Sequence, residues 1–488
     1  MLVMMNKLCL LALIVQFTAA KVNSRYYPRF HLAPPHGWMD DPNGFSVYKD
    51  EYHLFYQYNP NFSFEPGIPH WGHAKSKDLF HWEHLPIAMY PDEDYDKGGV
   101  FSGSALVEND TLYVIYTGNM NYPGKIPEYK HYQALAFSTD GVNFTKHKNN
   151  PIIKSKKHQL NIKNPKVWKH NDTYYMVLGN SFQNNTLGRA LLYTSQDLFS
   201  WTRASVLDYS DGSVGKLWEC PDFFSLQGAF VLLFSSHGFK PQGDKYKNEF
   251  QTGYVVGEFD YKTNIFTPVT EFRQLDYGHD FYAAQTMVDK NNRRIMIAWF
   301  DMWGGNYPEG ADGFTGFMTI PRVLSLTKQG RLVQKPVKEI TGMKGKLIRS
   351  GKADKGTTAT LTNKAGEIYI KASGHKSLEV IIESSNVTVK LIYNSIHGRV
   401  SLDRGGVDGV RRTKWRPHGR LRWLIYVDAS SVELFCGVGE VTLSSRFFPD
   451  GPISVRLGDR SKAKEFTVHD IKRTMPKPNI PMGHNQIN

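Results

Sequence analysis

Five similar apolar segments recur along the first two thirds of this chain. They cover residues 52–58, 112–118, 174–180, 230–236 and 294–300. Their spacing is roughly 55 to 65 residues, a period typical of repeated structural units. The segments are rich in aromatic and β-branched residues, which favour strands over helices. A chain with this pattern is expected to build a series of similar β-sheets.

A second sequence element follows four of these segments. It reads SKDLFHW at 76–82, STDGVNF at 138–144, SQDLFSW at 195–201 and DYKTNIF at 260–266. Each places turn-forming residues before an aromatic residue, as a hairpin requires. Long amphipathic helical patterns are absent. Repeated four-stranded sheets of this size close radially, so we predict a five-bladed β-propeller over residues 21–330. An irregular β-sandwich is the alternative that periodicity leaves open.

The sequence changes in character after residue 326. Residues 340–475 contain short strands with alternating polar and apolar residues, for example 366–373, 378–383 and 431–436. This pattern predicts a β-sandwich, and it contains no catalytic-looking cluster of carboxylates and aromatics. The fold class is therefore all-β: a five-bladed β-propeller followed by a C-terminal β-sandwich. Residues 476–488 are polar and Pro-rich, and are expected to be disordered.

The N-terminus has the features of a secretory signal peptide over residues 1–20. Lys7 precedes an apolar run at 8–17, and small residues follow at 18–20. The run is too short to span a membrane, and no other long apolar stretch predicts an anchor. We therefore expect a secreted, extracellular protein. Six glycosylation sequons fit this expectation; they begin at Asn61, Asn109, Asn143, Asn171, Asn184 and Asn386.

Charge and cysteine content exclude some classes of protein. The formal net charge is +13, but Lys and Arg look scattered along the chain rather than gathered in one arm, so we expect no nucleic-acid partner. Cys9 lies in the signal segment. Cys220 and Cys436 fall in different predicted domains, so neither a disulfide scaffold nor a bridge between them is expected.

Two segments contain candidate catalytic carboxylates. Hydrolysis of a glycosidic bond commonly needs two carboxyl groups, one on each side of the bond. Asp41 precedes Pro-Asn-Gly, which suggests a tight turn whose backbone N–H groups hold the carboxylate ionised. A plain Asx-turn explains the same residues equally well. Glu219 lies between Trp218 and an apolar run, surroundings that should raise its pKa toward the role of an acid.

These segments resemble the signature blocks of glycoside hydrolase family 32, the invertases and fructan hydrolases. The resemblance covers nearly the whole mature chain, with its blocks in order. The matching blocks are residues 38–44, Gln57, 71–74, 101–104, 164–168, 219–220, 280–285, 320–322 and 430–433.

The resemblance implies a substrate and a set of roles. Asp41 would attack the anomeric carbon of fructose, and Glu219 would act first as acid and then as base, with the two carboxyls about 5–5.5 Å apart. The substrate would be sucrose or a short fructan, with no metal or organic cofactor. The matching substrate-binding positions are Asp40, Asn43, Gln57, Trp71, Phe101, Ser102 and Lys163. For Trp71 and Phe101, core packing is an equal alternative.

Three departures from the family pattern bear on catalysis. Lys163-Asn164-Pro165 stands where the family usually has Arg-Asp-Pro, whose Asp binds fructose hydroxyls and stabilises the transition state. Asp40 replaces the usual Asn, and Glu65-Pro66-Gly67 stands where many members have Trp-Gly-Asn. Asn164 is therefore the third candidate catalytic residue, and a weakened one. The chain is either a retaining β-fructofuranosidase or a degenerate relative that binds sucrose or fructan. Its oligomeric state is open.

Overall fold

The computed structural model describes residues 23–125, 127–154 and 161–476, so the expected signal peptide and nearly all of the expected disordered tail lie outside it. The described chain is all-β. Its helical content is two short 3₁₀ helices, η1 (Pro308–Asp312) and η2 (Lys338–Met343). No helix in this part of the chain is long and apolar enough to cross a membrane.

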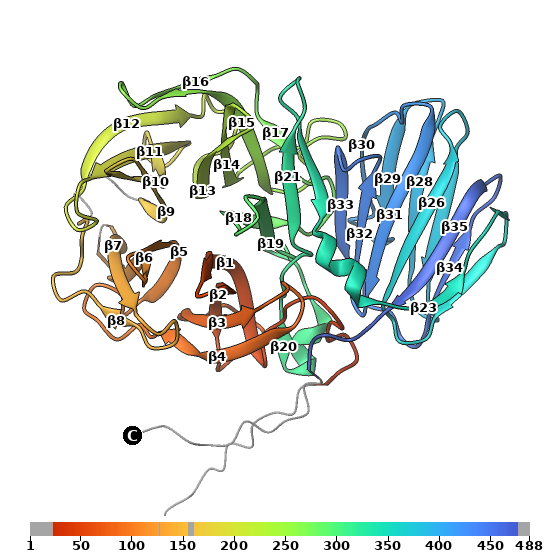
Figure 1. Ribbon diagram of the computed structural model, residues 1–488, viewed down its shortest axis with the longest axis horizontal. Coiled ribbons are helices and arrows are strands. Elements are labelled where there is room, and N and C mark those ends of the chain that lie inside the picture. The colour runs from red at the N-terminus through yellow and green to blue at the C-terminus, as the bar shows by residue number, and fades with distance from the viewer. Residues whose placement is uncertain (1–22, 126, 155–160, 477–488) are drawn as a thin grey trace, which may run out of the picture.

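Residues 37–336 form five sheets arranged around a common centre, antiparallel throughout except for one added strand (Figure 1). The first sheet holds β1 (Gly37–Tyr48), β2 (Glu51–Asn59), β3 (His70–Ser76) and β4 (Trp82–Met89), with β20 (Phe314–Thr315) added beside β1 in parallel. The second holds β5 (Gly99–Glu108), β6 (Thr111–Asn121), β7 (Tyr129–Ser138) and β8 (Thr145–Lys146). The third holds β9 (Lys163–His170), β10 (Thr173–Phe182), β11 (Leu187–Ser195) and β12 (Thr202–Tyr209). The fourth holds β13 (Leu217–Leu226), β14 (Ala229–His237), β15 (Phe250–Asp260), β16 (Ile265–Pro268) and β17 (Arg273–Gln274). The fifth holds β18 (Tyr282–Val288), β19 (Arg294–Trp299), β21 (Arg322–Leu326) and β22 (Leu332–Pro336).

The predicted repeats correspond to one position in every sheet. The five apolar segments coincide with the second strands β2, β6, β10, β14 and β19, which confirms the expected strands. The four turn elements join the third and fourth strands of the first four sheets. The turns are built alike: the hydroxyl of Ser76 accepts a hydrogen bond from the Leu79 amide, and the hydroxyl of Ser195 accepts one from the Leu198 amide. The repeat in sequence is thus a repeat of one sheet and one turn.

The innermost strand of each sheet contacts its two neighbours in cyclic order, from β1 through β5, β9 and β13 to β18 and back to β1. Two stacked sheets, the alternative that periodicity left open, would not give such a ring of contacts. The arrangement is consistent with five blades around an axis, and it directs the inner strands toward one central region (Figure 1).

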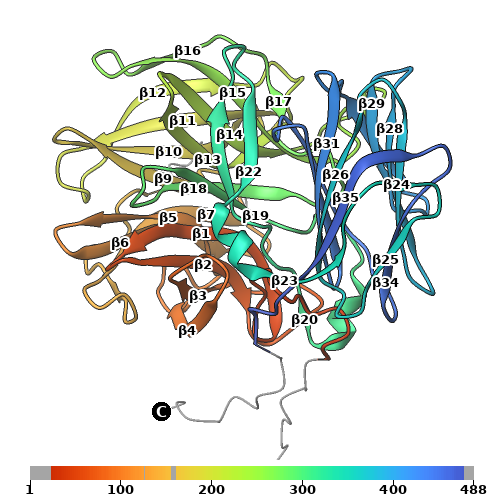
Figure 2. The ribbon, with the colours of Figure 1, turned by 45° about the vertical axis from the view of Figure 1, so that its right-hand side comes forward.

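The remaining strands form two antiparallel sheets that face each other (Figure 2). One sheet holds β23 (Lys344–Arg349), β24 (Ala353–Asp354), β26 (Gly366–Ser373), β31 (Arg420–Asp428), β32 (Ser431–Cys436), β33 (Val441–Arg446) and β35 (Lys462–Ile471). The other holds β25 (Thr358–Leu361), β27 (Leu378–Glu383), β28 (Thr388–Asn394), β29 (Arg399–Asp403), β30 (Val410–Lys414) and β34 (Ile453–Leu457). One apolar core drawn from both sheets lies between them. Cys220 and Cys436 are both free thiols, as expected.

A buried ionic network joins the two units. The ring nitrogens of His31 contact Asp428 at 2.8 Å and Glu433 at 2.9 Å, and Arg322 contacts Glu433 at 2.5 Å. Burial opposes the charged imidazolium, but the two carboxylates outweigh burial and raise the pKa of His31. The network places charges from the first residues, the fifth sheet and the second unit in one water-excluded cluster.

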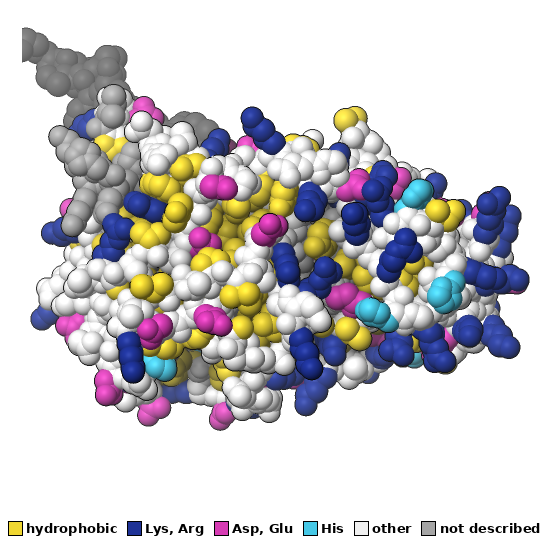
Figure 3. Space-filling view, turned by 90° about the horizontal axis from the view of Figure 1, so that it is seen from above, with side chains coloured by type: hydrophobic (Ala, Val, Ile, Leu, Met, Phe, Trp, Pro, Cys, Tyr) yellow, Lys and Arg dark blue, Asp and Glu magenta, His cyan; other side chains and the backbone are white. Residues whose placement is uncertain are grey.

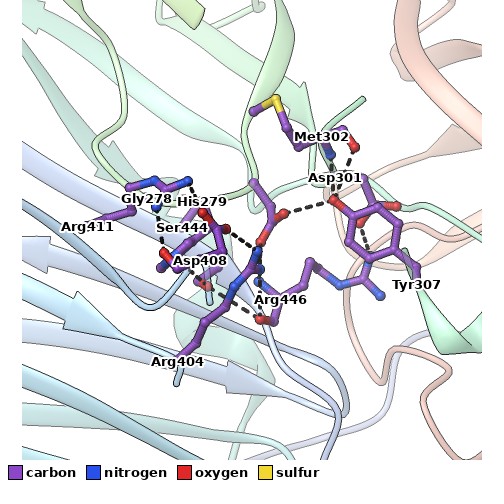
Figure 4. Close-up of polar contacts among 12 residues, drawn as sticks. Gly278, His279, Asp301, Met302, Tyr307, Arg404, Asp408, Arg411, Ser444 and Arg446 are labelled. Carbon is purple, nitrogen blue, oxygen red and sulfur yellow. Dashed lines mark hydrogen bonds and ion pairs between the residues drawn. The ribbon is translucent and has the colours of Figure 1, made fainter. Parts of the chain in front are cut away.

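A second polar cluster fixes the segment that leads into β18 (Figure 4). Arg446, at the end of β33, pairs with Asp301 and Glu309 of the first unit. Arg404, from the second unit, pairs with Asp280 at 2.6 Å. Asp280 lies two residues before Tyr282, the first residue of β18, so the second unit anchors the start of an innermost strand.

Candidate active site

All five innermost strands carry a break in register near their first residues. The breaks fall between Met39 and Pro42, between Phe101 and Gly103, beside Asn164, between Glu219 and Asp222, and between Tyr282 and Gln285. Three residues at these breaks have left-handed backbone, with φ of 61° for Asn164, 45° for Cys220 and 52° for Ala283. A β-bulge re-aims side chains at the end of a strand. Here the same device, repeated five times, turns polar side chains toward the centre.

Asp41 lies in the bulge of β1 rather than in the tight turn that Pro-Asn-Gly suggested. One carboxylate oxygen, Oδ2, accepts hydrogen bonds from Ser102 Oγ at 2.7 Å and from Cys220 Sγ at 3.3 Å. The other, Oδ1, has no hydrogen-bond partner among the described residues. The side chain is thus held by one oxygen and presents the other, as a nucleophile must.

The expected stabilisation of ionised Asp41 by backbone amides is also wrong. Burial raises the pKa of Asp41 to about 6, although hydrogen bonds from Ser102 and Cys220 lower it, and the charge of Glu219 raises it further. Side chains from two other sheets provide the donors. At neutral pH the carboxylate is still ionised, but it is more basic than a solvent-exposed one.

Asn43 and Gln57 brace the bulge. The Asn43 amide donates to the Asp41 carbonyl at 3.1 Å and to Gln57 Oε1 at 3.0 Å, and its own oxygen accepts from the Gly103 amide at 3.0 Å. Both side chains are buried. These contacts tie β1 to β2 and β5, and so fix Asp41 relative to Ser102.

Trp71 and Phe101 differ in their surroundings. Trp71 is fully buried and packs against Phe55 and Tyr116, while its indole N–H donates to the Phe101 carbonyl at 3.2 Å. This placement favours the core-packing alternative for Trp71. Phe101 is half-buried, and its ring lies 5.7 Å from that of His131. Of these two residues, only Phe101 is exposed enough to contact a sugar directly.

Glu219 lies in the bulge of β13 and has two polar partners from other sheets. Lys163 Nζ lies 2.5 Å from Oε1, and the Tyr282 hydroxyl donates to Oε2 at 2.6 Å. Burial favours the neutral acid, yet the ammonium of Lys163 outweighs burial and lowers the pKa of Glu219. The sequence-based expectation of a raised pKa is therefore wrong for this state, because Lys163 lies against the carboxylate.

Asn164 follows Lys163 in the bulge of β9 and is buried. Its backbone amide donates to Thr117 Oγ1 at 2.9 Å, and its side-chain oxygen has no partner among the described residues. Thr117 is in turn held by Gln133 Oε1 at 2.7 Å. A buried acceptor without a donor is expected to bind one from a ligand, since an unmet acceptor is costly.

Asp40 accepts hydrogen bonds from the Trp38 indole at 2.7 Å and from the Asp41 amide at 2.8 Å. Burial and the neighbouring charge of Asp41 nonetheless raise the pKa of Asp40 to about 8. Asp40 is therefore largely neutral at pH 7, close in charge to the family's Asn. Its contacts orient the backbone at Asp41.

The bulges bring Asp41 and Glu219 into one connected group. Cys220, next to Glu219, contacts Asp41, and Lys163, next to Asn164, contacts Glu219. That the Asn164 side chain faces the same space as the carboxylates of Asp41 and Glu219 stays a prediction. Sequence reasoning assigned no role to Tyr282 or Thr117. For the bulges themselves the sequence does contain a signal. A Pro follows Asp41, Asn164 and Cys220, and it marks the same bulge in three sheets.

Comparison with known proteins agrees with this architecture. The profile of the "Glycosyl hydrolases family 32 N-terminal domain" matches residues 31–336, and that of the "Glycosyl hydrolases family 32 C terminal" matches residues 331–472. The chain belongs to glycoside hydrolase family 32. It is a glycoside hydrolase of the β-fructofuranosidase type, and the resemblance read from its sequence is confirmed at this level.

Individual relatives come from bacteria, an insect and a fungus. A sucrose-6-phosphate hydrolase of Zymomonas mobilis is 38% identical over 465 residues, covering 88% of each chain. A raffinose invertase of Escherichia coli is 34% identical over 456 residues, covering 91% of this chain and 94% of the relative. The solved β-fructofuranosidase BmSUC1 of Bombyx mori is 39% identical with a TM-score of 0.89, covering 94% of this chain and 97% of that one. An exo-inulinase of Aspergillus awamori is 26% identical with a TM-score of 0.78, covering 94% and 100%.

Proposed function

We propose that this protein hydrolyses the terminal β-D-fructofuranoside bond of sucrose with net retention. The observation that carries the proposal is the placement of Asp41 and Glu219 on the bulges of β1 and β13, which the Cys220–Asp41 contact links, each carboxylate having its own set of partners. Support for the substrate comes from the 39% identical Bombyx mori enzyme, one variant of which was solved in complex with sucrose. Sucrose and sucrose 6-phosphate are both named among the relatives' substrates.

In the proposed first step, the free oxygen of Asp41 attacks the anomeric carbon of fructose while Glu219 donates a proton to the leaving glucose oxygen. The glycosidic bond breaks and a fructosyl–Asp41 ester forms. In the second step Glu219 removes a proton from water, the water oxygen attacks the same carbon, and the Asp41 carboxylate leaves. Lys163 and Tyr282 favour ionised Glu219, so they assist the second step more than the first.

Substrate assays test this proposal. Purified protein is given sucrose, sucrose 6-phosphate and inulin, and release of the reducing sugars is followed beside an Asp41→Ala control. We expect Asp41-dependent glucose release from sucrose, at a kcat/KM above that for the phosphorylated sugar and for inulin. Tight sucrose binding without turnover would favour the binding-protein alternative. Faster turnover of sucrose 6-phosphate or inulin would replace sucrose as the proposed substrate.

Asn164 is proposed to make the enzyme slower than relatives with an Asp at this position. An Asp carboxylate accepts two fructose hydroxyls with full charge, whereas an amide offers one neutral acceptor. The difference of about 1–2 kcal/mol in transition-state stabilisation corresponds to roughly tenfold in rate.

The double change Asn164→Asp with Lys163→Arg is expected to raise kcat on sucrose about tenfold or more, up to about 10²–10³ in a preorganised site. Arg keeps the positive charge beside Glu219, so the change isolates the restored carboxylate. Single substitutions serve as controls. An equal or lower kcat in a well-folded double variant would mean that the site has adapted to Asn164.

We also propose that the five sheets are the blades of a propeller over residues 21–330, followed by a sandwich over 340–475.

We propose in addition that the protein is secreted. Secretion is supported by the exposure of all six sequon asparagines. Expression in a eukaryotic host tests secretion: we expect product in the medium, beginning near Lys21, that loses mass on treatment with an N-glycanase. Intracellular product that retains residues 1–20 would contradict it.

A further inference from the structure

The sequence suggested that the positive charge of this protein is scattered, but most of the net charge belongs to the second unit. Residues 337–475 contain 25 Lys and Arg against 14 Asp and Glu, which gives +11 of the total +13. Lys and Arg side chains accordingly gather over the right-hand half of the face in Figure 3, where the second unit lies. A protein whose charge is concentrated in the unit remote from its active site has a surface suited to an anionic partner.

A groove of about 1130 Å³ lies where this basic unit meets the first unit. Its walls are β15 and β17, the loop between β21 and β22, a turn at residues 242–246, and strands β29 and β30. Seven Lys or Arg residues line it against four Asp or Glu. Asp41, Asn164 and Glu219 do not line it, so it is separate from the proposed catalytic centre. Its volume exceeds that of most pockets for single small molecules, which favours an oligomeric ligand.

Arg399 and Arg412 line the groove on the side of the second unit. They lie on the neighbouring strands β29 and β30, where Arg399 is opposite Lys414 and Arg412 is opposite Ser401. Alternate residues of a strand share a face, so Arg399, Arg412 and Lys414 point to the same side of the sheet. Lys414 makes no ion pair with any described residue. A pair of guanidinium groups beside a free ammonium matches a carboxylate or sulfate group.

Asp244 lies against both arginines and lines the same groove. It lies in a turn closed by mutual backbone hydrogen bonds of 3.0 Å between Gln242 and Lys245. One of its oxygens is 3.4 Å from Arg399 and the other is 3.4 Å from Arg412. Tight pairs of this kind measure about 2.7–2.9 Å, so both contacts are loose. Asp244 therefore positions the two arginines, and a ligand anion that makes shorter contacts with them can replace Asp244 as their partner.

Aromatic side chains complete the groove. Tyr246 and Phe272 have ring centroids 6.3 Å apart, and both line the wall contributed by the first unit. The Tyr277 backbone is fixed by a 2.9 Å hydrogen bond from its amide to the Thr442 carbonyl. Its hydroxyl makes no hydrogen bond to any described residue. Aromatic faces beside basic groups suit sugar rings that carry acidic substituents.

We propose that this groove binds an anionic oligosaccharide, with carboxylate or sulfate groups on Arg399 and Arg412 and sugar rings against Tyr246 and Tyr277. The ligand would hold the enzyme on an acidic glycan while the catalytic centre stays open. The groove is lined by seven basic and four acidic side chains, so it has an excess of positive charge. A neutral fructan has no negative charge to pair with this excess.

Binding to the full-length protein by isothermal titration tests this proposal. The probes are an oligogalacturonate, a sulfated oligosaccharide of similar length, inorganic sulfate, and inulin as the neutral sugar. We expect at least one charged oligosaccharide to bind, with an affinity that falls as salt rises. The uronate and sulfate probes distinguish the two sources of charge. No binding by either oligosaccharide, equal binding of inulin, or equal binding of inorganic sulfate would overturn the proposal.

Variants locate the site. Arg399→Gln with Arg412→Gln is expected to weaken binding about tenfold or more, since charge-assisted hydrogen bonds are lost. Asp244→Asn is expected to tighten it, because the internal competitor loses its charge. Lys376→Gln with Lys390→Gln removes the same charge outside the groove and is the matched control. An equal loss in the control, or no gain in Asp244→Asn with unchanged sucrose hydrolysis and melting temperature, would refute the assignment.

Discussion

Replacement of Lys163 by Met is the sharpest test of the electrostatics around Glu219. Lys163 Nζ lies 2.5 Å from the Glu219 carboxylate, and the two side chains are only 14% and 17% exposed. Met has a similar length and volume but no charge. The substitution removes the group that outweighs burial, so the pKa of Glu219 should rise.

The size of this rise follows from the separation of the two groups. With the dielectric constant of water, two unit charges at this distance attract by about 1.7 kcal/mol, which corresponds to about 1.2 pKa units. With the lower effective dielectric constant of a protein surface, the attraction is about four times larger and forms an upper limit. We therefore expect the pKa of Glu219 to rise by about one unit or more.

The assay is kcat/KM for sucrose as a function of pH. Because the pKa of Glu219 is lowered from 4.5 while that of Asp41 is about 6, Glu219 sets the acidic limb, and this limb should move to higher pH by about one unit in Lys163→Met. Lys163→Arg keeps the charge and should leave the limb within a few tenths of a unit. If the limb stays in place or moves to lower pH in a folded Met variant, Lys163 does not govern the ionisation of Glu219.

Three further predictions concern single side chains. Asp40→Asn removes a carboxyl whose pKa is raised to about 8, so wild-type stability should fall relative to the variant by about 1 kcal/mol per pH unit between about pH 5 and 8; a gap in melting temperature that does not change with pH would contradict this. Cys220→Ala removes a donor that lowers the pKa of Asp41, so activity should persist while the alkaline limb of kcat/KM, which Asp41 sets as the group with the higher pKa, moves up by less than about one unit; complete loss of activity would point to a different role. His31→Gln breaks a buried pair worth about 3–5 kcal/mol. Because the pKa of His31 is raised in the folded state, its contribution is present below about pH 6.5 and lost as pH rises through the folded value. Thermal unfolding should show a larger effect of His31→Gln at pH 5.5 than at pH 9, and the reverse order would refute this account.

The strands and hairpins were predictable because they depend on local patterns. Segments such as 52–58 are largely apolar along their whole length, as fully buried strands require, and the Ser-Xaa-Asp turns satisfy their own backbone amides. The strands of the second unit at 366–373, 378–383 and 431–436 agree with the structure residue for residue. The two carboxylates could be chosen because few others lie beside Trp and Pro.

The protonation behaviour of the site was not predictable, because it depends on neighbours distant in sequence. The local apolar surroundings of Glu219 predicted a raised pKa for its carboxyl group, but Lys163 and Tyr282 approach it from two other sheets. Asp41 was expected to be ionised by its own turn, but its donors come from Ser102 and Cys220. Local composition describes burial, whereas the direction of a pKa shift depends on which charge lies opposite.

The retaining mechanism of this protein is tested most directly by the stereochemistry of its product. Sucrose hydrolysis in the presence of methanol diverts the fructosyl–Asp41 ester to a methyl fructofuranoside, whose anomer can be assigned by NMR without interference from mutarotation. The account predicts methyl β-D-fructofuranoside as the product, absent in Asp41→Ala. Formation of the α-anomer, or of the β-anomer at an undiminished rate in Asp41→Ala, would contradict it.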